Sequence, residues 1–169
     1  MRKHNRLSHY DYSSNGAYFI TMCTKDRTNI LGDIIGKAEE GVGDNDVDDV
    51  DDVGANCVRL NPSNIGQIVL DEIVNLNTVY DTVSLDCYVV MPNHIHMIIM
   101  IDCERRTQFA PTISTIVKQF KGKITKEIGY SIWQKSFHDH VIRDERDYTK
   151  IYEYIQTNPL KWKLDKYFA

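Results

Sequence analysis

The segment from residue 83 to residue 101 constrains the fold of this chain more than any other part of the sequence. Val83 to Val90 and His94 to Ile101 are both rich in β-branched and apolar residues, which favours two strands. Met91-Pro92-Asn93 separates them, and a Pro-Asn pair suits a turn or bulge between antiparallel strands. The sequence therefore predicts an antiparallel strand pair at the centre of the fold.

His94 and His96 lie in the second of these strands. Side chains alternate across a strand, so both imidazoles point to one face and Ile95 points to the other. Two polar rings in an apolar strand require partners, which makes the pair either half of a metal site or a structural pair with its own hydrogen bonds. His138 and His140 form a second pair of this kind, but in polar surroundings where exposure to solvent is a sufficient explanation.

The remaining segments predict an α+β sandwich. Residues 17–23 and 132–142 have the composition or alternation of strands, and apolar residues recur at helical spacing in segments 63–79, 111–124 and 145–157. Ser63 and Asp144 can cap the first and last of these helices, and Pro159 ends the last one. The order of elements favours a ferredoxin-like or RRM-like fold, an antiparallel sheet with helices packed on one face.

The net charge of −4 over 169 residues hides an asymmetry along the chain. Residues 39–53 carry eight of the 24 acidic residues and no basic one, so the rest has 20 basic and 16 acidic residues, a net charge of +4. We interpret residues 39–56 as an acidic loop inserted into a single domain that spans residues 1–169. A basic body of this kind is compatible with nucleic-acid binding.

Other features indicate a cytoplasmic protein. The four cysteines form no CxxC pair, and free thiols in a reducing compartment are the expected state. The first 13 residues are basic and polar, which is unlike a signal peptide, and no apolar run approaches the ~20 residues of a membrane span. The sequence does not distinguish a monomer from a homodimer.

The last predicted helix places a tyrosine and an asparagine beside its apolar stripe, which consists of Tyr148, Ile151, Tyr152 and Ile155. At about 100° per residue, Tyr154 lies roughly 110° from the centre of that stripe, at its margin. Asn158 follows four residues later and lies nearly above Tyr154. The two are either a hydroxyl and an amide that face one site, or a rim aromatic and a helix C-cap.

Two stretches taken together resemble the REP-associated tyrosine transposases, members of the HUH single-tyrosine transposases related to insertion-sequence transposases. They are YVVMPNHIH at residues 88–96 and YIQTNP at residues 154–159. Supporting stretches run from Asp11-Tyr12 to Thr21, at Trp133-Gln134 with Phe137, and from Asp139 to Arg143. The resemblance covers nearly the whole chain apart from the acidic insertion.

The resemblance implies cleavage and rejoining of single-stranded DNA at or near hairpins of repetitive extragenic palindromes (REPs). Tyr154, on the C-terminal helix, would be the nucleophile that forms a 5′-phosphotyrosine and leaves a 3′-hydroxyl. His94, His96 and Asn158 would hold a divalent metal, and mixed imidazole and amide ligands suit Mg²⁺ or Mn²⁺. A free tyrosine has a pKa of about 10, so local charge or a base must assist Tyr154, and Lys150 is either such a charge or a solvated lysine.

The residues expected to contact DNA are basic. Arg2, Lys3 and Arg6 form an N-terminal arm that can read bases beside a hairpin, and the candidate backbone contacts are Lys118, Lys121, Lys123 and Arg143. Trp133 and Phe137 either stack on unpaired bases or pack in the core. The main alternative function is a non-catalytic, domesticated hairpin-binding protein. An RRM-type RNA-binding module is disfavoured because residues 15–19, NGAYF, match its aromatic motif poorly.

Overall fold

A computed structural model describes residues 15–35, 59–102, 111–164 and 167. A four-stranded antiparallel sheet has the strand order β4-β5-β1-β6. Its strands are β1 (Gly16–Cys23), β4 (Val83–Met91), β5 (His94–Ile101) and β6 (His138–Ile142). The pairing of β4 with β5 confirms the predicted hairpin around Pro92-Asn93, and the α+β fold class is also confirmed.

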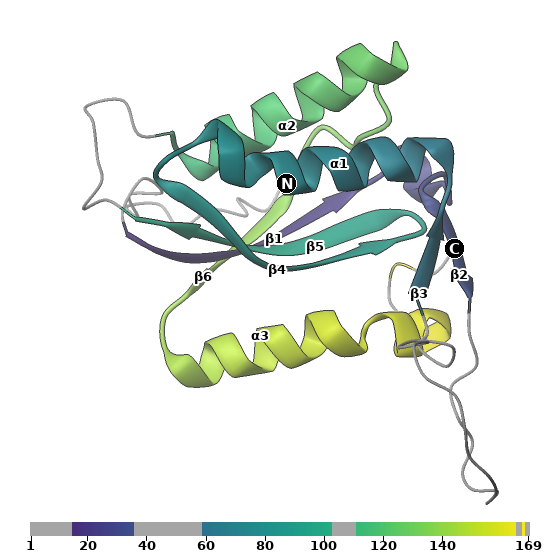
Figure 1. The fold of residues 1–169 in the computed structure, drawn as a ribbon. Helices are drawn as coiled ribbons and strands as arrows, with labels where there is room; N and C mark the ends of the chain where they lie inside the picture. The colour runs from purple at the N-terminus through teal and green to yellow at the C-terminus, as the bar shows by residue number, and fades with distance from the viewer. Residues whose placement is uncertain (1–14, 36–58, 103–110, 165–166, 168–169) are drawn as a thin grey trace, which may run out of the picture.

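Helices cover both faces of the sheet (Figure 1), whereas the sequence predicted helices on one face only, because the apolar stripe of the last helix packs on a second, smaller cluster. α1 (Asn64–Val79) and α2 (Ile113–Ile128) lie side by side on one face, and α3 (Glu145–Thr157) crosses the other. The alternation along β5 divides its side chains between the two faces. Ile95, Met97 and Ile99 join the core beneath α1 and α2, whereas Ile98 joins a smaller cluster beneath α3. The side chains of His94 and His96 therefore belong to the α3 face.

Side-chain caps fix where the helices begin. The Ser63 hydroxyl accepts a hydrogen bond of 3.0 Å from the Gly66 amide, and Thr112 caps α2 through the Thr115 amide. Asp144 caps α3 by accepting a 2.8 Å bond from the Asp147 amide, as the sequence predicts. These caps satisfy backbone donors that the first helical turn leaves without partners.

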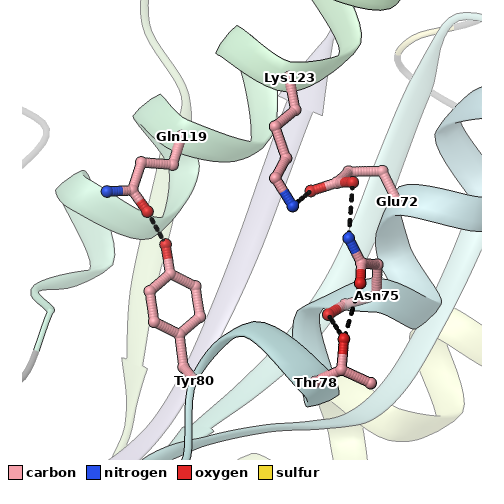
Figure 2. Close-up of polar contacts among 6 residues, drawn as sticks. All are labelled: Glu72, Asn75, Thr78, Tyr80, Gln119 and Lys123. Atoms are coloured by element: carbon pink, nitrogen blue, oxygen red, sulfur yellow. Dashed lines mark hydrogen bonds and ion pairs between the residues drawn. The ribbon is translucent and has the colours of Figure 1, made fainter.

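Polar contacts join α1 to α2 on their outer surface (Figure 2). Lys123 Nζ lies 3.2 Å from Glu72 Oε1, and the Tyr80 hydroxyl donates a hydrogen bond to Gln119 Oε1. Lys123, a candidate DNA contact, therefore has an intramolecular ion pair in this structure.

The structure differs from the sequence prediction in three further places. β6 begins at His138 and not at residue 132, because Trp133 makes an isolated bridge to Thr24 and the chain then turns. A two-stranded sheet of β2 (Gly32–Ile35) and β3 (Arg59–Pro62) was not predicted, since each strand has only four residues. Tyr152 is 40% exposed and does not belong to the core stripe. The acidic insertion, residues 39–56, falls between β2 and β3 in the sequence, and all of it lies outside the described residues.

Candidate active site between the sheet and the last helix

His94 and His96 lie together beneath the C-terminal half of α3. Their ring centroids are 4.6 Å apart, and the side chains are 0% and 1% exposed. β5 is an inner strand paired on both sides, with β4 and β1, so its backbone holds the two rings at a fixed spacing. Desolvation of two imidazoles is costly unless each makes hydrogen bonds, and both do.

Asn93 determines which nitrogen of His94 carries the proton. Its amide nitrogen Nδ2 donates to the carbonyl oxygens of Arg27, at 3.1 Å, and Tyr167, at 2.8 Å. Its oxygen Oδ1 therefore faces His94 Nδ1 at 2.8 Å, and Nδ1 must donate because an amide oxygen only accepts. In the neutral ring, His94 Nε2 then carries the lone pair that can act as a ligand.

His96 joins the sheet to Tyr154. Its Nδ1 lies 2.8 Å from the Thr21 hydroxyl on the neighbouring strand β1. Its Nε2 lies 3.2 Å from the Tyr154 hydroxyl, and the two rings meet edge to face with centroids 5.1 Å apart. Phe19 stacks on the His96 ring at 5.3 Å and meets Tyr154 edge-on at 6.1 Å. Tyr154 is 37% exposed, so its ring lies between the buried imidazole and solvent.

Asn158 is the C-cap of α3 and is 2% exposed. Tyr154, four residues earlier, contacts His96, and Trp162 in the following 3₁₀ helix η2 (Pro159–Leu164) lies 5.9 Å from the His94 ring. Residues that precede and follow Asn158 in the sequence thus contact the histidine pair. The Tyr167 ring also lies against His94, with a centroid distance of 4.6 Å. Aromatic rings from the C-terminal part of the chain therefore cover the pair.

No group of three His, Cys, Asp or Glu side chains suited to a metal occurs in the described ranges. The ligand set that the resemblance implies is different, because its third member, Asn158, is an amide. The other histidine pair, His138 and His140, is exposed, as the sequence predicts. His140 Nε2 lies 2.8 Å from Asp147 Oδ2.

The candidate DNA contacts lie in different parts of the molecule. Arg2, Lys3 and Arg6 fall outside the described residues. Lys118, Lys121 and Lys123 are on α2, across the sheet from the histidine pair, while Arg143 lies just before α3. Lys121 donates to the carbonyl oxygens of Gln134, at 2.9 Å, and Ser136, at 3.2 Å, and burial lowers its pKa to about 8. Lys118 is exposed.

Trp133 packs in the core beneath α2. It is 5% exposed, and its ring lies 6.2 Å from that of Phe120. Phe137 is partly buried against the same cluster. Between the two roles considered for these aromatics, the structure supports core packing.

Sequence reasoning missed two features near the site. Thr21 and Asn93 orient the two imidazoles, but the sequence indicates only that Thr21 lies in a strand and Asn93 in a turn. A surface hollow beside the start of α3 was also missed, although it is lined by closely spaced charged residues: His140, Arg143, Asp144, Arg146, Asp147 and Lys150. Within the described ranges, no helix is both long enough and apolar enough to cross a membrane.

The fold and site define an α+β protein with two strand histidines and a tyrosine on a facing helix. No family model matches the sequence. An uncharacterised protein of Haemophilus influenzae is 33% identical over 190 aligned positions, covering 99% of this chain and 93% of that protein. A REP-associated tyrosine transposase of Escherichia coli K12 is 36% identical over 79 residues, which are 46% of this chain and 45% of that protein.

A solved structure of a REP-associated tyrosine transposase bound to a REP hairpin has the same fold, with a TM-score of 0.62 and 20% identity. The match covers 95% of this chain and 77% of that one. The chain is therefore similar to REP-associated tyrosine transposases in about half of its sequence and in its fold.

Proposed function

We propose that this chain cleaves and rejoins single-stranded DNA at or near REP hairpins, with Tyr154 as the nucleophile. The observation that carries the proposal is the 3.2 Å distance between the Tyr154 hydroxyl and His96 Nε2. It brings a partly exposed phenol to a pair of buried imidazoles in a chain that is similar to REP-associated tyrosine transposases. A related structure holds a REP hairpin, which supports this class of DNA as the substrate.

The proposed reaction exchanges one phosphate ester for another. The Tyr154 oxygen attacks phosphorus and loses its proton, and the bond from phosphorus to the 3′ oxygen breaks. The leaving oxygen takes up a proton and becomes a 3′-hydroxyl, while the 5′ end stays joined to Tyr154 as a phosphotyrosine. Because the new ester conserves the energy of the old one, attack by a 3′-hydroxyl reverses the step without ATP.

His94, His96 and Asn158 would hold a divalent ion, Mg²⁺ or Mn²⁺. The donor chemistry fits, because the Asn93 contact leaves the His94 Nε2 lone pair as the coordinating one and Asn158 supplies an amide oxygen. When bound, the ion supplies Lewis-acid stabilisation of the phosphate oxygens and orients the substrate. The protein's own part is to hold the two rings through Thr21 and Asn93 and to present Tyr154 from α3.

A covalent-adduct assay tests the proposal. The full chain is incubated with Mn²⁺ and a labelled single-stranded oligonucleotide that contains a palindromic hairpin, and the products are separated on a denaturing gel. The wild type should give a protein–DNA adduct, which EDTA prevents. Tyr154→Phe should give none, while the exposed-tyrosine variant Tyr152→Phe serves as a matched control and should give the wild-type amount. A wild type without adduct, or an equal adduct in Tyr154→Phe, would overturn the proposal.

A second candidate is a hairpin-binding protein without catalysis. The observation that favours it is the complete burial of the His94 side chain, against which the Tyr167 ring lies. This candidate predicts hairpin binding of equal affinity in the wild type and Tyr154→Phe, with no adduct from either. The same gel, combined with a binding titration, separates the two functions.

A further inference from the structure

A hollow of about 470 Å³ lies where β6 passes into α3, on the same helix as Tyr154. Every residue that lines it has a titratable or charged side chain: His140, Arg143, Asp144, Arg146, Asp147 and Lys150. A hollow with no apolar side chain is unsuited to a hydrophobic ligand and suited to an ion or a charged chain.

The two carboxylates of the hollow already serve the local structure. Asp144 accepts the helix-capping bond from the Asp147 amide. Asp147 accepts from His140 Nε2 at 2.8 Å and from the Arg143 amide at 3.4 Å, and the hydrogen bond from His140 is the main cause that lowers the pKa of Asp147. Both acids thus engage backbone donors or the His140 ring.

The three cations of the hollow are available for a ligand. Arg143, Arg146 and Lys150 are exposed, and in the part of the chain that the structure describes no carboxylate lies within ion-pair distance of any of them. A guanidinium binds a phosphate through two parallel hydrogen bonds, and an ammonium binds one as a point charge. The hollow therefore has the side chains that recognise phosphate oxygens.

The cations lie in line with the nucleophile. Arg146, Lys150 and Tyr154 follow one another at intervals of four residues on α3. Each interval rises about 6 Å and turns by about 40°, so the three form a slowly winding row on one side of the helix. A chain of phosphates bound along this row would lead from the hollow to the Tyr154 hydroxyl.

We infer that the hollow and the row bind backbone phosphates of the single DNA strand that flanks the scissile phosphate. This inference rests on the proposed function and deepens it, because it gives the strand a path: along α3, from Tyr154 past Lys150 and Arg146 to the hollow beside Arg143. The path lies on the α3 face of the sheet, across from the lysines of α2 (Figure 1).

The test measures binding without catalysis. Fluorescence anisotropy in EDTA follows two synthetic oligonucleotides over a range of salt concentrations: a palindromic hairpin with ten-thymidine flanks on both ends, and the same hairpin without flanks. The variant Arg146→Gln/Lys150→Gln is compared with Arg59→Gln/Lys135→Gln, which removes one exposed arginine and one exposed lysine elsewhere. Hairpins with one flank, 5′ or 3′, then identify which strand follows the row.

We call Arg146→Gln/Lys150→Gln the row variant. For the flanked hairpin, its slope of log K against log salt concentration should be smaller in magnitude than that of the wild type by about 1.4, since each phosphate contact in a single strand contributes about 0.7. The control variant should keep the wild-type slope, and binding of the flankless hairpin should be equal in all three proteins. Arg146→Lys/Lys150→Arg keeps both charges and should restore the slope.

An unchanged slope in the row variant would overturn the inference. So would an equal loss on the flankless hairpin, or a wild type whose binding does not depend on flanks. These outcomes are independent of the covalent-adduct assay. If the protein forms no adduct but shows the flank-specific slope change, the strand path stands and the proposed catalysis is overturned. If it forms an adduct but shows no slope change, the proposed catalysis stands and the strand path is overturned.

Discussion

The Tyr148 hydroxyl donates a hydrogen bond of 2.5 Å to Asp86 Oδ2 and thereby joins α3 to β4. A bulge makes this bond possible, because Leu85 pairs with Ile99 and Cys87 with Ile98, leaving Asp86 as an extra residue. Cys87 then also faces α3, where its sulfur accepts a 3.3 Å hydrogen bond from Gln156 Nε2. These two bonds hold α3 on either side of Tyr154, so the bulge fixes the position of the proposed nucleophile above the sheet.

Tyr148→Phe should lower the free energy of unfolding by about 1 kcal/mol, the usual net value of one such hydrogen bond. The bond to Asp86 is the main cause that raises the pKa of Tyr148 to about 12. Since folding favours the neutral phenol, the contribution is complete below the ordinary pKa of 10 and is lost as the pH rises through 12. Urea unfolding of both proteins between pH 8 and pH 12 measures this loss.

Tyr152→Phe is the control for this measurement, because Tyr152 is exposed and stacks on Tyr148 from outside. It should change stability by less than about 0.5 kcal/mol at any of these pH values. Equal effects of the two substitutions would show that the Asp86 bond contributes nothing to stability.

Thr21→Val should reduce the rate of covalent-adduct formation by roughly 10- to 100-fold, the usual effect of removing a group that orients a ligand histidine. The substitution keeps the size and branching of a buried side chain but removes the hydroxyl that contacts His96 Nδ1. Thr21→Ser restores the hydroxyl and should restore most of the rate. The ¹⁵N shifts of the His96 ring should move in the valine variant and return in the serine variant. An unaltered rate with unaltered shifts would mean that Thr21 does not orient the ring.

The sequence was sufficient to predict the hairpin of β4 and β5, the common face of His94 and His96, and the capped start of α3. Each of these follows from local patterns: alternation, a Pro-Asn turn, and an aspartate before a helical segment. The position of Tyr154 at the margin of the α3 stripe was also predictable, because it depends on helical geometry alone.

What the sequence could not supply depends on contacts between distant segments. Thr21 reaches His96 because β1 pairs with β5 in the register that sets Thr21 opposite His96. Lys121 stays a predicted phosphate contact, and only the tertiary structure shows that its Nζ donates to two loop carbonyls. Tyr152 looked like a core residue because it is an aromatic residue at helical spacing from the other apolar side chains of α3. Its exposure depends instead on how α3 lies on the sheet.

Lys121→Met should remove a pH dependence from the stability of the protein. Burial lowers the pKa of Lys121 to about 8, so between pH 8 and the ordinary value of 10.5 the unfolded chain binds the extra proton. The stability that Lys121 contributes should therefore be smallest below pH 8, rise with pH across this window and level off above 10.5. The difference in unfolding free energy between wild type and variant should grow from pH 7 to pH 10. A difference that is constant over this range would contradict the lowered pKa.

Two glycines in helices should respond to alanine in opposite directions. A Cβ on Gly66 would lie 1.8 Å from the Leu31 carbonyl oxygen, so α1 must shift away from the β2 segment to accommodate it. Gly66→Ala should therefore lower the free energy of unfolding by about 1 to 3 kcal/mol, as overpacking does. Gly122 lies in the middle of α2, and a Cβ there would meet no atom within 4 Å apart from the neighbouring backbone of its own helix. Gly122→Ala should therefore raise stability by about 0.5 to 1 kcal/mol. Thermal unfolding of the two variants beside the wild type measures both effects. α1 and α2 both lie on the face of the sheet opposite α3, which carries Tyr154, so neither substitution touches the proposed site. A Gly66→Ala protein as stable as the wild type would disprove the close contact between α1 and Leu31.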